Sequence, residues 1–347
     1  MDLACFDYEL PPSAIAQAPP ATRDAARLLR IDRRTGRLHD HRFVDLPALL
    51  RPGDCVVVNE SRVIPARVLA HDVVADRAVE LLFVEPTVDG RRWRALVRPG
   101  RRCRAGAELV TAAPPPVRLR VVAVENDGVR VIERLDGGTV ADLLETHGLP
   151  PLPPYIERHA KPDPEDRARY QTIYARTPGS VAAPTAGLHF TPAIVDALRV
   201  RGIDIHALTL HVGPATFRPL RAADVDAHAL PPERVTISAD VAAAVNAARV
   251  EGRRVVAVGT TTTRALEGCT GADGRLEPRV GGVDLYIRPG HRFRAVDALL
   301  TNFHLPRSSL LVLVAAFAGL DLVLEAYRHA LAAGYRFYSY GDATLIV

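Results

Sequence analysis

Apolar and polar residues alternate through residues 54–135, which indicates a series of short β-strands. Asp89-Gly90 and Asp127-Gly128 separate some of the runs, and Asp-Gly pairs favour tight hairpins because glycine accepts a positive φ angle. The pattern therefore predicts a small β-barrel or sandwich, and we favour the barrel. The strand-like runs are CVVVN, VIPARVLA, AVELLFVE, RWRALVRP, VRLRVVAV and VRVIERL.

From about residue 170, apolar strands alternate with helical patterns. The segment TPAIVDALRVRG has a threonine cap, a proline at the first helical position and a terminal glycine, which are typical start and stop signals of a helix. The runs IDIHALTLHVG, RRVVAVGT and GVDLYIRPG are typical of strands. This alternation predicts a layered sheet with helices on its faces.

The β-rich segment ends in the helix TVADLLETHG, which Thr139 caps and Gly148 closes. The proline-rich run LPPLPPY that follows suits a stiff crossing between domains. Residues 1–50 show little periodicity, and we expect them to pack with the α/β part. The predicted fold class is α/β, with a layered α/β domain formed by residues 1–60 and 152–347 and a small inserted β-barrel domain of residues 61–151.

The composition is that of a globular protein, with 48% hydrophobic residues in a chain of 347. No run reaches the roughly 18 uninterrupted apolar residues of a membrane span. The first ten residues, MDLACFDYEL, carry acids where a signal peptide carries bases. The four cysteines are too scattered for a zinc or redox motif. We therefore expect a cytoplasmic protein that has no membrane segment and binds no metal.

Common nucleotide-binding and hydrolase motifs are absent from the sequence, so the candidate sites are clusters at strand ends. The run VVAVGTTTTRALE passes from strand through glycine into a helix that opens with threonines. Helix N-termini bind anions and polar groups through free backbone amides. We expect Thr260, Thr261 and Arg264 to bind substrate there, although an ordinary capped turn would have the same pattern.

Three histidines also lie at element ends, where α/β folds place ligands. His189 closes a small uncharged loop, His211 follows a strand, and His304 follows Asn302 in LLTNFHLP. Histidine is the side chain best suited to proton transfer near neutral pH. We predict that these three form the catalytic set, with the order of their roles open, and that substrate contacts come from Asn302, Thr185 and Gly187.

Arginine supplies 43 of the 44 basic residues, since Lys161 is the only lysine. A GC-rich genome explains such a bias without function. The segment DGRRWRALVRPGRRCR nevertheless has seven arginines in sixteen residues and a tryptophan, as expected of a surface that follows phosphates and stacks on bases. The candidate contacts for RNA or another anion are Asn59, Arg62, Arg67, Arg91, Arg92, Trp93, Arg101 and Arg102.

Eight motifs occur in an order that covers nearly the whole chain. In this order the sequence resembles the S-adenosylmethionine:tRNA ribosyltransferase-isomerases of queuosine biosynthesis. The motifs are NESRVIPARV, LPPLPPYIER, YQTIYARTPGSVAAPTAGLHFT, TLHVGPATFRPL, VAVGTTTTRALE, VDALLTNFHLP, SLLVLVAAFAG and YRFYSYGDATLI.

The resemblance implies an enzyme that transfers the ribosyl part of S-adenosylmethionine to 7-aminomethyl-7-deazaguanine at the wobble position of tRNA and isomerises it. The product is epoxyqueuosine in tRNA, and adenine and methionine are released. S-adenosylmethionine is then a co-substrate, no metal is required, and we expect a monomer. In such a site Asp342 would bind the ligand amine or the deazaguanine, and Tyr340 would stack nearby.

The chain departs from the family pattern at Pro231, which stands where a second histidine is usual. This departure leaves two alternatives open. One is a related S-adenosylmethionine-dependent ribosyl transferase that acts on a free deazaguanine or another small amine. The other is a non-catalytic RNA-binding protein, for which the basic β domain would suffice.

Overall fold

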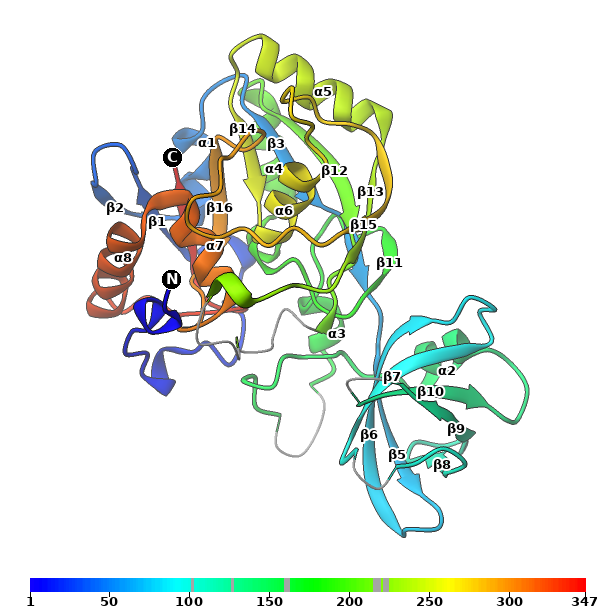
Figure 1. Ribbon diagram of the computed structural model, residues 1–347. Helices are drawn as coiled ribbons and strands as arrows, with labels where there is room; N and C mark the ends of the chain where they lie inside the picture. The colour runs from blue at the N-terminus through cyan, green and yellow to red at the C-terminus, as the bar shows by residue number, and fades with distance from the viewer. Residues whose placement is uncertain (101–102, 126–127, 159–162, 215–219, 221–224) are drawn as a thin grey trace.

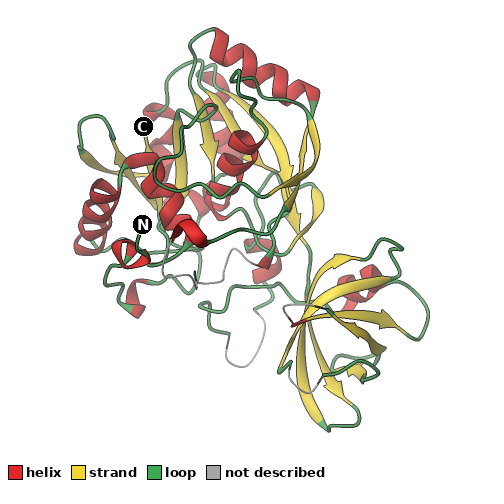
Figure 2. Ribbon diagram, in the orientation of Figure 1, coloured by secondary structure: helices red, strands yellow, loops and turns green. Residues whose placement is uncertain are grey.

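The computed structural model describes all residues except 101–102, 126–127, 159–162, 215–219 and 221–224. A large body of sheet and helices carries a smaller barrel at one end (Figures 1 and 2). The predicted fold class, α/β with an inserted small β-barrel, is confirmed. The sequence leads to this arrangement because two kinds of hydrophobic pattern occupy separate stretches of chain. The barrel strands alternate with a period of two residues, and the body mixes strand and helix patterns.

The main sheet has nine strands in the order β15-β13-β12-β3-β14-β16-β17-β1-β2. Its centre, β12-β3-β14-β16, is parallel, whereas β17 runs antiparallel to β16 and parallel to β1. The carboxyl ends of the central strands therefore share one edge, where such folds bind ligands. The strands are β1 (Arg27–Ile31), β2 (Leu38–Arg42), β3 (Cys55–Asn59), β12 (Asp204–Leu210), β13 (Glu233–Ile237), β14 (Val255–Val258), β15 (Arg279–Val283), β16 (Ala298–Asn302) and β17 (Ala343–Ile346).

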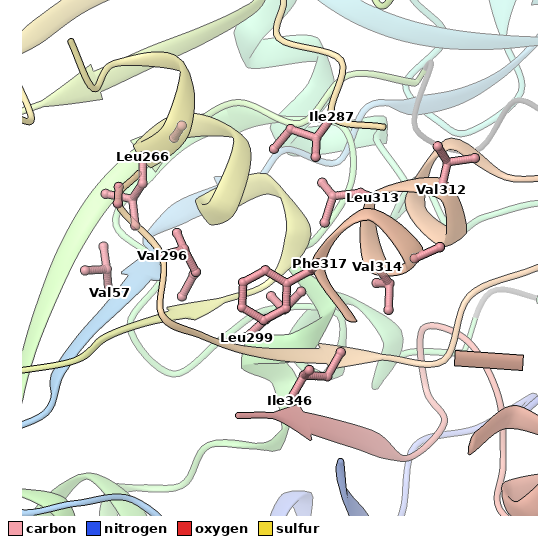
Figure 3. Packing of buried hydrophobic residues seen from close by; sticks show 14 of the residues in the cluster. Val57, Leu266, Ile287, Val296, Leu299, Val312, Leu313, Val314, Phe317 and Ile346 are labelled. Atoms are coloured by element: carbon pink, nitrogen blue, oxygen red, sulfur yellow. The ribbon is translucent and has the colours of Figure 1, made fainter. Parts of the chain in front are cut away.

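Helices cover both faces of this sheet, so the central strands are buried on both sides. Val57 of β3 joins the core under α5, α6 and α7, whereas Val56 and Val58 join the core under α1 and α4. Figure 3 shows the first core, with Val57 and Leu299 near Leu266 and Phe317. The helices of this body are α1 (Leu46–Leu49), α3 (Asp166–Arg169), α4 (Pro192–Val200), α5 (Ala239–Val250), α6 (Thr260–Gly268), α7 (Ser309–Ala318) and α8 (Leu320–Ala332).

The smaller body is a closed barrel in the order β10-β7-β6-β5-β8-β9. Helix α2 (Val140–His147) contributes Val140, Leu143 and Leu144 to its core. The strands are β5 (Arg67–Asp72), β6 (Arg77–Pro86), β7 (Arg92–Arg98), β8 (Glu108–Thr111), β9 (Arg118–Val124) and β10 (Val129–Arg134).

The chain enters and leaves the barrel at one point, where Arg67 and Leu149 form an antiparallel bridge. Just before it, β4 (Ser61–Val63) pairs with β11 (Thr177–Ser180) outside the barrel. The exact domain boundaries, 61 and 151, stay a prediction.

Several elements differ from the sequence expectations. Strands β1 and β2 lie within the N-terminal segment that showed little periodicity. For β2 (LHDHR) the reason is that it is an exposed edge strand with little apolar pattern. The run CVVVN forms β3 of the main sheet. The strand expected at GVDLYIRPG ends at Val283.

As far as the described residues go, no single helix has both the length and the apolar character to cross a membrane. The pair α7 and α8, bent by 112°, meets the length and composition criteria only when taken together.

Candidate active site

The N-terminus of α6 lies at the carboxyl edge of the main sheet, directly after β14. Gly259 makes the turn with φ +91°, which a residue with a Cβ rarely adopts, and it provides no side-chain cap. Thr262 and Thr263 donate their hydroxyls to carbonyl oxygens one turn back, at 2.7 Å and 3.1 Å. The buried Oγ1 of Thr261 has no hydrogen-bond partner among the residues that the structure describes.

A pocket of about 40 Å³ opens at this helix end, and we refer to it as the strand-end pocket. Five predicted site residues come together in it: Thr185, Thr260, Thr261, Asn302 and His304. The helix dipole and the free amides of α6 give one side of the pocket a positive potential. The rest of its wall comes from Ala182, Ala183, Pro184, Ala186, Val212, Gly259, Thr301, Leu310, Tyr338 and Ser339.

Asn302, the last residue of β16, is fixed on both sides of its amide. Its Oδ1 accepts the Thr185 hydroxyl at 3.0 Å, and its Nδ2 donates to the Tyr338 carbonyl at 3.1 Å. These bonds join three of the segments that form the wall. The amide thus holds the shape of the pocket while Thr185 and Asn302 both line it.

His304 is the one histidine of the predicted set that lines the strand-end pocket. Its Nε2 lies 3.0 Å from Thr301 Oγ1, and its backbone N–H donates to Tyr327 Oη at 3.0 Å. Burial lowers the pKa of His304 to about 3, so the imidazole is neutral at physiological pH. A neutral imidazole has a lone pair that can accept a proton, and the lowered pKa makes this ring a weaker base than an exposed histidine.

His189 lies outside the strand-end pocket. Its ring stacks on Phe43 at 5.0 Å, and its Nδ1 and Nε2 face the carbonyl oxygens of Ala186 and Gly341 at 3.2 Å and 2.9 Å. Burial lowers its pKa. Carbonyl oxygens only accept, so the one N–H of a neutral ring satisfies one of them. In this arrangement His189 ties its loop, Thr185–His189, to the turn before β17.

His211 follows β12 and does not line the strand-end pocket, although its neighbour Val212 does. Gly179 packs on its ring so closely that an added Cβ would lie 2.7 Å from Cε1. Its buried Nδ1 has no hydrogen-bond partner within the described part of the chain. Burial, with a smaller contribution from Arg234, lowers the pKa of His211 to about 4.

Arg264 belongs to a second, smaller pocket rather than to the strand-end pocket. It is buried and forms an ion pair with Glu233, and its Nε donates to the Leu285 carbonyl at 2.9 Å. Leu310 of α7 lines both pockets, so they are neighbours. The sequence predicted Arg264 beside Thr260, but the arginine side chain reaches back to β13 instead.

Three other predicted substrate contacts are engaged by the protein itself. Both oxygens of Asp342 accept backbone amides, from Arg27 at 2.8 Å and Arg336 at 2.7 Å. Gly187 makes room for Tyr174, since a Cβ there would lie 2.1 Å from the tyrosine hydroxyl. Tyr340 is buried against Tyr170, at 6.0 Å between ring centroids. The structure brings none of the three to the strand-end pocket.

The predicted anion contacts near the barrel differ in whether their side chains are exposed or already bound within the protein. Asn59 is buried and clamps both backbone groups of Leu210, Arg67 pairs with Glu80 at 2.7 Å, and Arg92 pairs with Glu133 at 3.2 Å. Arg62 and Arg91 are exposed. Trp93 is half-buried against Phe83. Arg101 and Arg102 lie outside the described residues.

A hollow of about 300 Å³ lies where the barrel meets the α/β body. Arg62 lines it, and the ion pair between Arg167 of α3 and Glu145 of α2 joins the two bodies at its wall. No sequence pattern pointed to Arg167, Tyr170 or Gln171, because their proximity to the barrel depends on the fold. The same holds for Thr301, Tyr338 and Ser339 in the strand-end pocket, although Thr301 directly precedes Asn302.

Because His304 is buried with a lowered pKa, we expect the protein to lose stability in acid. The ordinary histidine pKa is about 6.5, and that of folded His304 is about 3. At pH values between these two pKa values the unfolded chain binds more protons than the folded chain. The contribution of His304 to the free energy of unfolding is therefore fully present above pH 6.5 and is lost as the pH falls toward 3. From pH 6.5 to 4.5 we expect His304 to account for about 2 kcal/mol.

Urea unfolding of the parent and of His304→Gln at the two pH values measures this contribution. Carboxylates contribute equally to both proteins, so only the difference between them matters. We expect the variant to lose less stability than the parent over this range. Equal losses in the two proteins would show that His304 takes up no proton on unfolding in this range.

Among the described residues, no three His, Cys, Asp or Glu side chains come together as a metal-binding group. The family model for a queuosine biosynthesis protein matches residues 3–346. S-adenosylmethionine:tRNA ribosyltransferase-isomerase of Moorella thermoacetica is 50% identical over 343 residues, which cover 99% of this chain and 98% of that protein. The enzyme of the same name from Anaeromyxobacter dehalogenans strain 2CP-C is 52% identical, with 100% and 99% covered.

A solved structure is similar over the same length. The crystal structure of S-adenosylmethionine tRNA ribosyltransferase from Thermotoga maritima is 36% identical, covers 99% of this chain and 100% of its own, and superimposes with a TM-score of 0.56. The match of the family model over nearly the full length, with relatives of this identity, shows that the chain belongs to the queuosine biosynthesis protein family.

Proposed function

We propose that this chain is an S-adenosylmethionine:tRNA ribosyltransferase-isomerase. It transfers the ribosyl group of S-adenosylmethionine to 7-aminomethyl-7-deazaguanine at the tRNA wobble position, isomerises it, and releases adenine and methionine. The observation that carries this proposal is the identity of 50% and 52% to enzymes of that name over the full chain. A cytoplasmic location, a monomeric state and the absence of a metal stay predictions.

The strand-end pocket is the proposed place of reaction. The carboxylate of S-adenosylmethionine binds at the N-terminus of α6, beside Thr260 and Thr261, where amides and the helix dipole favour an anion. The unpartnered Oγ1 of Thr261, as far as the structure describes its surroundings, supports a ligand at this point. Arg264 is not part of this carboxylate site, because its side chain forms an ion pair with Glu233 instead.

His304 is the proposed proton acceptor. The positive sulfonium acidifies the adjacent ribose C5′, and a neutral imidazole takes that proton. If Nε2–H donates to Thr301, the other ring nitrogen keeps its lone pair for this role. His211 has the second neutral imidazole and remains a candidate for proton transfer to the departing adenine. His189 is a positioning residue, which holds the loop that carries Thr185.

The remaining steps belong to the substrates. Adenine departs with a proton on a ring nitrogen, and the aminomethyl nitrogen forms a bond to the ribosyl group. The C1′–O4′ bond opens and leaves an imine at C1′ and an alkoxide on C4′. The deprotonated C5′ bonds to C1′, which closes the carbocycle, and the alkoxide then displaces methionine from C5′, which closes the epoxide. The neutral walls of the pocket keep water away from these intermediates and favour unprotonated histidines.

One experiment tests this function against both alternatives. The purified protein is incubated with S-adenosylmethionine and one of three partners: tRNA carrying the modified base, the free base, or unmodified tRNA. We expect adenine release and an epoxyqueuosine nucleoside by mass spectrometry with modified tRNA alone. Release with the free base would favour the small-amine transferase. Binding of tRNA without release in any mixture would favour the non-catalytic RNA-binding protein.

The barrel predicts salt-dependent tRNA binding through its exposed arginines. Arg94 is paired with Glu85 and Glu125, whereas Arg91 and Arg98 are exposed and have no ion-pair partner in the described part of the barrel. We expect Arg91→Gln and Arg98→Gln each to reduce the slope of log affinity against log salt by about 1, as loss of one phosphate contact does.

Filter binding or anisotropy at several salt concentrations measures that slope. Arg37→Gln is the matched control, because Arg37 is an exposed arginine on the β1–β2 hairpin, across the α/β body from the barrel (Figure 1). An unchanged slope in both barrel variants would remove this face of the barrel from the tRNA interface.

A further inference from the structure

The second pocket, beside the strand-end pocket, contains two polar atoms that the protein leaves unsatisfied. Arg264 Nη2 is buried and lacks a hydrogen-bond partner among the described residues, as does the hydroxyl of Tyr286. Both residues line this hollow of about 20 Å³. Such a volume accommodates about one water molecule or one oxygen atom of a ligand. Buried donors without partners cost free energy, so they point to a group that binds there.

Two contacts hold the Arg264 guanidinium in one orientation, and they thereby set the direction of its remaining N–H groups. Nη1 pairs with Glu233, and Nε donates to the Leu285 carbonyl at 2.9 Å. Glu233 itself accepts the Gly213 amide at 3.1 Å. Tyr286 directly follows Leu285, so one segment fixes both donors. Burial raises the pKa of Tyr286 to about 12, which keeps its hydroxyl protonated.

The charge of the pocket selects a neutral ligand group. The negative charge of Glu233 compensates that of Arg264, and a carboxylate would add an unpaired charge in a buried place. The rest of the wall is apolar apart from Ser309, with Leu230, Pro231, Ile287, Leu310 and Leu313. Figure 3 shows Ile287 and Leu313 side by side at this point. The hollow therefore matches one uncharged acceptor atom at the edge of a ring, with the ring itself outside the hollow.

A carbonyl oxygen fits the two donors better than a ring nitrogen does. It has two lone pairs and accepts from Arg264 and Tyr286 together, whereas a ring nitrogen has one. Adenine has no carbonyl group. The reacting deazaguanine has a 6-oxo group, and unpaired loop bases are commonly recognised through this edge.

We propose that Arg264 and Tyr286 recognise the 6-oxo group of the deazaguanine and so select the base that reacts. This assignment rests on the proposed function. In the bicyclic ring, C6 and C7 are both bonded to C5, so the oxo group and the aminomethyl group lie on one side. Anchoring the oxygen in the second pocket therefore brings the aminomethyl nitrogen toward the strand-end pocket, across Leu310. Pro231, in place of the family histidine, adds no competing polar group to this wall.

The test compares two anticodon stem-loop RNAs, one with the natural base and one with its 2,6-diamino analogue, in which an amino group replaces the oxo group. An amino group donates and opposes both protein donors. We expect the parent to prefer the oxo RNA by about 10- to 100-fold in kcat/KM. Tyr286→Phe and Arg264→Lys should reduce that ratio several-fold and raise KM for the oxo RNA, with KM for S-adenosylmethionine unchanged.

Tyr335→Phe is the matched control, since its hydroxyl donates to Asp40 on the β1–β2 hairpin, and it should keep the parental ratio. An unchanged ratio in both pocket variants, or a rise in KM for S-adenosylmethionine instead, would overturn the assignment. Failure of the proposed function is a separate result: the parent then releases no adenine with either RNA. Equilibrium binding of the two RNAs would still test the oxo preference in that case.

Discussion

Replacement of His304 by glutamine is expected to lower kcat for adenine release by about 10²- to 10⁴-fold, the range typical of a general base. His304 is the histidine that combines a place in the strand-end pocket with a pKa of about 3. It is therefore unprotonated near neutral pH. Glutamine retains a polar group near Thr301 and introduces no charge, so the fold should tolerate it.

Single-turnover release of adenine measures this effect with the least influence of product release. Because folded His304 titrates near pH 3, its loss should change the height of the pH profile between pH 6 and 8 and leave its shape unaltered. His189→Gln is the comparison, and we expect it to act mainly on stability, since its ring nitrogens face two carbonyl oxygens and its ring stacks on Phe43. Parental release by His304→Gln would exclude His304 as the base.

The sequence predicted the fold class because hydrophobic period reports directly on burial. The barrel strands alternate, and the central strands of the main sheet are buried on both faces, as parallel strands are. The pattern failed where burial is partial. Strand β2 has no buried residue, and its place in the sheet comes from pairing with β1 rather than from its own side chains.

The candidate site was predicted at the level of loops and less well at the level of side chains. Thr260, Thr261, Asn302 and His304 are found together because parallel strands bring their carboxyl ends to one edge. Arg264 stands one helical turn from Thr260, yet its long side chain reaches Glu233, which is 31 residues away in sequence. The sequence predicted Asp342 as a ligand contact. In the structure its two carboxylate oxygens accept the backbone amides of Arg27 and Arg336, which only the fold brings close.

Removal of Arg264 alone should be the most destabilising change in the second pocket. Arg264 and Glu233 are 6% and 7% exposed at their side chains, so Arg264→Met removes the cation of a buried ion pair. Breaking a buried ion pair in this way costs about 3–5 kcal/mol. We expect a loss of that size in the free energy of unfolding, measured by urea denaturation at pH 7 and followed by far-UV circular dichroism.

The double variant Glu233→Gln/Arg264→Met separates the charge from the packing. Glutamine keeps an oxygen that accepts the Gly213 amide, and methionine fills much of the arginine volume. Neutral replacements of a buried pair often cost little, so the double variant should recover most of the stability that Arg264→Met loses. If the losses of the two single changes simply add, the pair contributes nothing as a pair. A recovered fold that no longer prefers the oxo RNA would then indicate that the buried charge is kept for recognition rather than for stability.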